Sequence, residues 1–218
     1  MKPSIDEIIV GDEPDPWIAA GFSIDNDGLC RIGTVRVRLA GRTHGKRILQ
    51  WSMRNIADWS ADPASLAEPI TGLITTRSDV EPSEPSAHPN GSLLIDHVVV
   101  VTPDCDRTIA EFEALGFPAL RTRTTGNYGA PMRQTFFRAG EVIIELVGPE
   151  QPSGDGPAAF FGLAITVSDL DRTAALLGSA LGEAKDATQP GRRIATLRHR
   201  QLGSSVAIAF ISVESDLD

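Results

Sequence analysis

A histidine stands early in the apolar run LLIDHVVVV, residues 93–101, and an unbroken row of valines follows it. An imidazole in such a place can bind a divalent metal, transfer a proton or only hydrogen-bond inside the core. The other three histidines have weaker contexts, because His44 and His88 lie in loop-like sequence and His199 lies between two arginines. His97 is therefore the first candidate for a functional residue.

Common nucleotide, metal and hydrolase motifs are absent from the sequence, which has no P-loop, no strand-linked GxGxxG, no HExxH, no CxxC and no GxSxG. The chain has 20 basic and 29 acidic residues, and its net charge of −9 repels nucleic acid and anionic membranes. No apolar run is long enough to cross a membrane, and the N-terminus has no signal-peptide order. These features predict a cytoplasmic monomer or homodimer whose partner is a small-molecule ligand.

The elements around His97 follow a regular order. Residues 93–101 predict a strand, CDRTIAEFEALG an amphipathic helix, and PALRTRTT, MRQTFFRAG and EVIIELVG three further strands. This βαβββ unit covers residues 93–150. The same order recurs over residues 157–213, where FFGLAITVSDLDRTAALLGSALG precedes GRRIATLRHRQLGSSVAIAFIS.

The chain before residue 93 divides into two parts. Proline, serine and acidic residues predict an exposed linker at 76–92. Residues 1–75 predict a partial, degenerate βαβββ region, since SIDEIIVG matches LIDHVVVV and CRIGTVRVRLAG matches FRAGEVIIELVG. A further degenerate copy begins at ILQWSMRNI, residues 48–56, in one interpretation. Residues 214–218 form an acidic tail.

A tandem βαβββ unit in which IDHVVVVTPDCDRTIAEFEALGF closes on FRAGEVIIELVGP resembles the vicinal oxygen chelate superfamily, which includes glyoxalases, bleomycin-resistance proteins and extradiol dioxygenases. The resemblance covers residues 93–213 and is faint before them. It implies an α+β fold in which paired βαβββ units form curved mixed sheets with helices outside. It also implies a cup in which a divalent metal is held by the first and last strands of each unit. Members include lyases, isomerases, dioxygenases and sequestering proteins, so the fold alone selects no function.

The resemblance places His97 and Glu145 at the first-strand and last-strand metal positions of the unit at 93–150. In the next unit these positions hold Gly162 and Ala209, which offer no donor atoms. A catalytic zinc site has three protein ligands, and oxygen-rich magnesium or manganese sites also need several donors. We therefore expect no metal cofactor.

The upstream copy has Glu7 and Arg38 at the same two points, and a guanidinium has no lone pair for a cation. Three interpretations of His97 and Glu145 remain open: a remnant pair that hydrogen-bonds, part of a metal site, or a metal-free acid and base. The third has a physical basis, because a neighbouring carboxylate increases the basicity of a neutral imidazole and fixes its tautomer.

Side-chain alternation along the strands predicts the surroundings of this pair. His97 and Glu145 point into an apolar lining, and the facing wall is made mostly of small residues that include Gly162, Ala164 and Ala209. The space beside these small residues either accommodates an organic ligand or is filled by neighbouring side chains.

Four polar side chains on two strands offer anion or amide contacts if alternation turns them inward: Arg133, Gln134, Arg121 and Arg123. Arginines on strands of a small domain are more often solvated. Tyr128 lies in the glycine-rich loop TTGNYGAP, which either covers the mouth of the cup or only connects two strands.

Three functions are compatible with these features. The first is a glyoxalase-like protein that binds a small organic metabolite and acts on it as a lyase or isomerase, with His97 and Glu145 as catalytic residues. The second is a non-catalytic protein that sequesters a drug or metabolite, as in the bleomycin-resistance branch. The third is a fold with an inactive site that serves association only.

Overall fold

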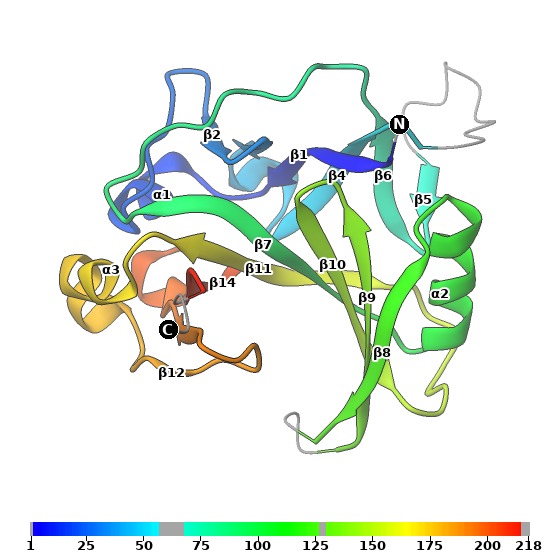
Figure 1. Ribbon diagram of the computed structural model, residues 1–218. Coiled ribbons are helices and arrows are strands. Elements are labelled where there is room, and N and C mark those ends of the chain that lie inside the picture. Colours follow the sequence, from blue (N-terminus) through cyan, green and yellow to red (C-terminus); the bar gives the residue numbers. More distant parts are fainter. Residues whose placement is uncertain (1, 57–67, 127–129, 215–218) are drawn as a thin grey trace.

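The computed structural model describes residues 2–56, 68–126 and 130–214. These residues form two β-sheets, one stacked on the other (Figure 1). The first sheet contains β1 (Ser4–Val10), β2 (Leu29–Ile32), β3 (Val35–Leu39), β4 (Ile48–Arg54), β5 (Glu68–Ile70) and β6 (Leu73–Arg77). The second contains β7 (Ser92–Val101), β8 (Ala119–Thr125), β9 (Met132–Ala139), β10 (Val142–Pro149), β11 (Ala159–Val167), β12 (Lys185–Asp186), β13 (Arg193–Thr196) and β14 (Ala207–Ser212). The α-helices are α1 (Pro14–Ala19), α2 (Cys105–Ala114) and α3 (Leu170–Leu177).

The second sheet is built from two similar halves. In the first half β7 pairs in parallel with β10, and β9 and β8 follow in antiparallel order. In the second half β11 pairs in parallel with β14, and β13 and β12 follow in the same way. Antiparallel pairing of β7 with β11 joins the halves. The prediction of an α+β fold in which paired βαβββ units form a mixed sheet is confirmed.

Each half has one helix that begins at a capping aspartate. The Asp104 carboxylate accepts a hydrogen bond from the backbone N–H of Arg107 at the start of α2. The Asp169 carboxylate accepts two backbone N–H groups at the start of α3. A carboxylate at this position satisfies otherwise unpaired amides and interacts favourably with the helix dipole. Within the described residues, no helix has the length and apolar character needed to span a membrane.

The first sheet repeats the pairing order of the second with fewer strands. β1 pairs in parallel with β3, β4 pairs in parallel with β6, and β1 and β4 pair antiparallel between them. β2 and β5 lie at the two edges of the described sheet, whose order is β2-β3-β1-β4-β6-β5. The proposed further copy at 48–56 coincides with β4, while residues 57–67 lie outside the described part of the chain.

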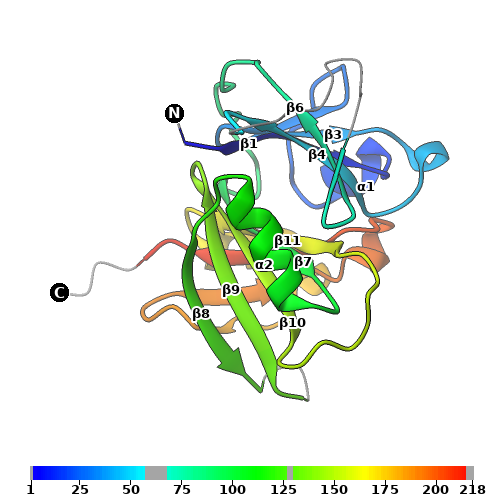
Figure 2. The same cartoon turned by 90° about the vertical axis from the view of Figure 1, so that its right-hand side faces the viewer.

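One continuous core lies between the two sheets, and Figure 2 shows the first sheet on one side of the second with α2 beside β9 and β10. Val98 of β7 and Ile144 of β10 point into this core. Trp51 of β4 packs against Phe160 of β11 with ring centroids 4.9 Å apart. The other alternate side chains of β7 and β10 therefore face away from the first sheet, into a cavity.

Residues 78–91 connect β6 of the first sheet to β7 of the second and contain no helix or strand. Hydrogen bonds of one histidine hold this segment in place near its end. His88 is buried; its Nδ1 accepts the backbone N–H of Ser23 at 3.1 Å, and its Nε2 lies 2.9 Å from the carbonyl oxygen of Arg31. These two contacts define the neutral tautomer with the proton on Nε2. Of the acidic tail, only Glu214 belongs to the described residues.

Candidate functional site

An irregularity in β7 brings two polar side chains to the same face of the strand. His97 pairs with Ala164 of β11, and Ile95 pairs with Ile165, so Asp96 is the extra residue of a β-bulge. A bulge changes the direction in which side chains point. As a result both Asp96 and His97 line the cavity.

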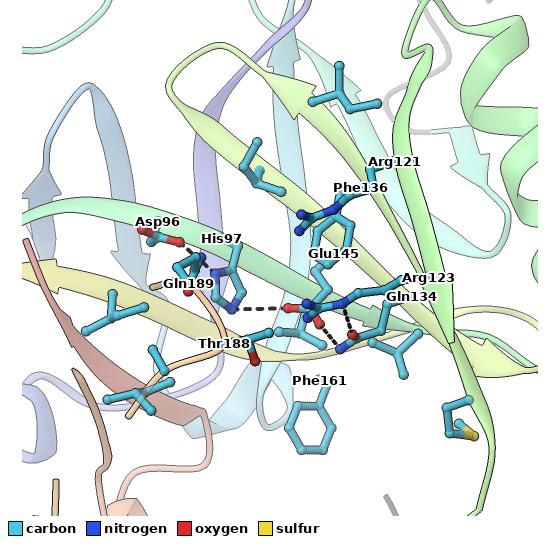
Figure 3. A pocket seen from close by; sticks show the side chains of 18 of the residues that line it. Asp96, His97, Arg121, Arg123, Gln134, Phe136, Glu145, Phe161, Thr188 and Gln189 are labelled. Atoms are coloured by element: carbon cyan, nitrogen blue, oxygen red, sulfur yellow. Dashed lines mark hydrogen bonds and ion pairs between the residues drawn. The ribbon is translucent and has the colours of Figure 1, made fainter. Parts of the chain in front are cut away.

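A chain of polar contacts crosses the cavity wall from β7 to β8 (Figure 3). His97 Nδ1 lies 2.8 Å from Asp96 Oδ1, and His97 Nε2 lies 3.2 Å from Glu145 Oε2. Gln134 Nε2 donates to Glu145 Oε1 at 2.5 Å, and Arg123 Nε donates to Gln134 Oε1 at 2.7 Å. Both carboxylates that flank the imidazole are thus held in place by other residues.

Asp96 also holds the opposite wall of the cavity. Its Oδ2 accepts from Arg192 Nη1 at 2.7 Å and from Thr166 Oγ1 at 3.1 Å. Burial by itself would raise the pKa of Asp96, but the hydrogen bonds and positive charges of His97 and Arg192 outweigh burial and lower this pKa to about 2. Asp96 is therefore ionised and orients the His97 ring.

The cavity has a volume of about 960 Å³, which lies in the range of pockets that hold small organic ligands. Its walls come from both halves of the sheet and from both edge strands, β8 and β12. Apolar side chains dominate the wall around the polar chain: Val99, Val101, Leu120, Met132, Phe136, Ile143, Val147, Phe161, Ile194 and Ile211. The predicted apolar surroundings of His97 and Glu145 are present.

Gly162 and Ala209 hold, in the second half, the positions that His97 and Glu145 hold in the first. Glu145 pairs with the residue two after His97, and Ala209 pairs with the residue two after Gly162. A Cβ added to Gly162 would lie 2.3 Å from the carbonyl oxygen of Ala207. The missing side chain at Gly162 thus reflects the close approach of β14 and leaves no room for a ligand.

The other residues predicted to bind substrate lie elsewhere. Ala164 is buried, and neither it nor Gly162 nor Ala209 is among the residues that line the cavity. Arg133 alternates with the inward-facing Gln134 and points to the opposite face, where it donates to Asp106 of α2 at 2.6 Å. Tyr128 lies outside the described residues.

Several residues of the site were not singled out from the sequence. Asp96 immediately precedes His97, but only the bulge turns it inward, and no sequence signal marks the bulge. The segment at 185–190 lines the cavity through Thr188, Gln189 and their neighbours, although its sequence has no periodic pattern. Arg192 lies just after this segment and reaches Asp96, 96 residues away in the sequence, which sequence spacing does not reveal.

The sequence matches the model of one family, described as the Glyoxalase/Bleomycin resistance protein/Dioxygenase superfamily, over residues 94–198. These residues form a domain of that superfamily. No curated protein matches the chain significantly.

Three solved structures illustrate what the chain is similar to. A triple mutant of 4-hydroxymandelate synthase from Streptomyces coelicolor is 13% identical, with a TM-score of 0.64 over 97% of this chain and 93% of that one. A fusion of a xylose isomerase-like TIM barrel with 4-hydroxyphenylpyruvate dioxygenase is also 13% identical, with a TM-score of 0.62 over 99% of this chain and 49% of that one. Methylmalonyl-CoA epimerase from Mycobacterium tuberculosis is 22% identical, with a TM-score of 0.47 over 58% and 92%. At these identities the first two structures show a shared fold that includes the N-terminal sheet.

The four positions at which the resemblance places metal ligands in the second sheet hold two donor side chains, His97 and Glu145. Asp96 is close by, but it is paired with Arg192, whose positive charge opposes a cation. Across the described ranges, no three His, Cys, Asp or Glu side chains gather in a way that holds a metal ion. The donor set does not fit a three-ligand metal centre.

Proposed function

We propose that the domain binds a small organic metabolite in the cavity and moves a proton on it, as an isomerase or lyase, with His97 and Glu145 as acid and base. The observation that supports this most strongly is the 3.2 Å approach of His97 Nε2 to Glu145 Oε2 on a cavity wall that is otherwise mostly apolar. An acid and a base held within hydrogen-bond reach of each other are suited to proton transfer at a bound carbon atom.

The contacts of His97 and Glu145 with neighbouring residues determine which of the two acts as the acid and which as the base. When His97 Nδ1–H donates to Asp96, the neutral imidazole has its lone pair at Nε2, facing Glu145. When Nε2 also carries a proton, the 3.2 Å contact with Oε2 is an ion pair. With that proton on His97, Glu145 is the base and His97 is the acid.

The reaction begins at a C–H bond next to a carbonyl group of the ligand. Glu145 removes the proton, and the electron pair of the C–H bond moves to the carbonyl oxygen to form an enolate. Returning the proton to another carbon or to the opposite face isomerises the ligand, while expulsion of a leaving group from the enolate makes the protein a lyase. Protonated His97, and Arg123 beyond Gln134, supply positive charge for the enolate.

We propose that this chemistry needs no divalent metal. The second half contributes Gly162 and Ala209 where the superfamily places ligands, so coordination would rest on two side chains and water. Two side-chain ligands hold a catalytic metal weakly.

Proton transfer can be tested before the substrate is known. Small 2-oxo acids, aldehydes and thioesters are incubated with the protein in D₂O, and the loss of α-proton signals is followed by NMR. We expect catalysed exchange with at least one compound and a loss of at least about tenfold in His97→Ala and in Glu145→Gln. Arg138→Gln, an exposed position on β9 that does not line the cavity, is the matched control. Undiminished exchange in both site variants would contradict the proposal.

A second function, sequestration of a stable ligand, is favoured by the rim of the cavity. Leu120 is 54% exposed and Phe161 is 53% exposed, and both line the cavity. Exposed apolar side chains on a cavity wall offer contact surface to an apolar ligand. Tight binding of a bulky aromatic compound by a protein that exchanges no proton in any of the carbonyl compounds would favour this function.

A further inference from the structure

We propose that the ligand of the cavity is an organic anion whose acidic group binds Arg121 and Arg123 while its apolar body lies against the apolar wall of the cavity. The inference rests on the proposed function, because it concerns the ligand of the same site. It names a class of compound, an aromatic or otherwise apolar body with a carboxylate, sulfonate or phosphate group, and not one compound.

The first observation is the placement of the two arginines. Arg121 and Arg123 alternate on β8, so both side chains lie on the same face of the strand and line the cavity. Their guanidinium carbons lie 4.9 Å and 5.2 Å from the centroid of the Phe136 ring. Cation–π contacts hold both groups against the same aromatic ring (Figure 3).

The second observation is the lack of a neutralising partner. Among the described residues, no carboxylate forms an ion pair with Arg121 or Arg123, and the hydrogen-bond partner of Arg123 is the neutral amide of Gln134. The inward-facing Glu145 already accepts from that same amide. The guanidinium groups therefore keep N–H donors for an anion, which Arg binds in a bidentate manner.

The opposite edge of the sheet adds no net charge. Lys185 and Asp186 of β12 both line the cavity, and their charges offset each other. The other two lining carboxylates, Asp96 and Glu145, are held by Arg192 and Gln134. The unpaired positive charge is therefore concentrated on β8, which attracts an anion to that edge of the cavity.

The register of the strands gives the size of the ligand. Arg121 pairs with Phe136 across β8 and β9, and Phe136 pairs with Glu145 across β9 and β10. Strands in a sheet are about 4.8 Å apart, so the backbones of Arg121 and Glu145 are about 10 Å apart along the sheet. A single ring or a short chain between the acidic group and the reacting carbon spans this distance.

Two fluorescent probes that share a ring system and differ in charge test the inference. The sulfonate 1-anilinonaphthalene-8-sulfonate and the neutral N-phenyl-1-naphthylamine are titrated into the full chain, and affinity is read from the rise in emission. We expect the sulfonate to bind more tightly. The Arg121→Gln/Arg123→Gln double variant is expected to weaken sulfonate binding by about tenfold or more, which corresponds to about 1.4 kcal/mol, and to leave the neutral probe within about twofold.

Two controls separate this inference from the proposed function. Arg138→Gln removes one positive charge from the neighbouring strand without touching the cavity, and its sulfonate affinity is expected to match the parent protein. His97→Ala is expected to keep sulfonate affinity while it loses deuterium exchange. Equal affinity for both probes, or an unchanged sulfonate affinity in the double arginine variant, overturns the inference even where exchange activity is found.

Discussion

His97 and Glu145 meet diagonally across two parallel strands. In the register of β7 and β10, Glu145 is paired with Val99 and not with His97, yet the two side chains approach to 3.2 Å. Diagonal neighbours on one face of a sheet are within reach of long side chains. Because both residues sit inside strands and not on loops, the backbone register itself fixes their separation.

Gln134 is predicted to position Glu145. Gln134→Leu removes the donor to Glu145 Oε1 while both residues remain buried, and an unsatisfied buried acceptor costs about 1–3 kcal/mol. We expect at least about tenfold slower deuterium exchange at saturating substrate with little change in KM. Gln134→Glu is the contrasting variant, since a second carboxylate would repel Glu145. A change confined to KM would show that Gln134 binds substrate directly.

Asp96 is predicted to make stability depend on acid pH. Its pKa is lowered from 3.8 to about 2, so the ionised form stabilises the fold by about 2 kcal/mol above pH 3.8, and this contribution is lost as pH falls toward 2. Urea unfolding of Asp96→Asn between pH 7 and pH 3 should show lower stability at neutral pH and a smaller loss in acid. Equal slopes with pH in parent and variant would contradict the shift.

His88 is predicted to weaken the fold at mildly acidic pH. Burial lowers its pKa below 6.5, more than its hydrogen bond to Arg31 raises it, so the folded state favours neutral imidazole. Its contribution to stability is therefore complete above pH 6.5 and declines as the unfolded chain binds protons below that pH. Urea unfolding at pH 7.5 and 5.5 should show a larger drop for the parent than for His88→Gln, which can still donate and accept.

Gly162 is predicted to be required for strand pairing. In Gly162→Ala the new Cβ would lie 2.3 Å from the Ala207 carbonyl oxygen, so β11 and β14 must separate. We expect a loss of about 1–3 kcal/mol in the free energy of unfolding. Gly154→Ala is the control, because no atom lies within 4 Å of a Cβ added there. Equal stability of the two variants would refute the packing argument.

The protein is predicted to hold no stoichiometric divalent metal. Elemental analysis after mild dialysis should find well below one equivalent of zinc, nickel, manganese or iron, because two donors bind weakly. The parent and His97→Ala are measured together. One equivalent in the parent that is lost in the variant would make a metal-dependent reaction the leading assignment.

The strands of the second sheet and the two helices of its halves could be predicted because their sequence patterns are local. LLIDHVVVV alternates between two apolar faces, and helix-capping aspartates follow both first strands. The placement of His97 and Glu145 in one cavity followed from a resemblance, not from spacing, since nearly fifty residues separate them.

The orientation of the other site residues depends on strand register and on a bulge, which the alternation of side chains along a strand does not reveal. Arg133 and Gln134 are adjacent and equally polar, and only the register of β9 decides that Gln134 faces inward. Asp96 faces inward because one bulge interrupts the pairing of β7. The small size of Gly162 was compatible with a ligand or with neighbouring protein atoms beside it, and the Ala207 backbone lies there. Long-range pairing determines all three.

Asp96 has two structural roles at once. It orients the His97 ring, and it holds part of the cavity wall in place. Through Oδ1 it fixes the His97 imidazole. Through Oδ2 it holds Arg192, whose Nε donates to the Ser212 carbonyl oxygen at 2.7 Å and so ties the chain just after the 185–190 segment to β14. Substitutions at Asp96 and Arg192 are therefore expected to be strongly non-additive. Over evolution this part of the cavity wall cannot change independently of the tautomer of His97.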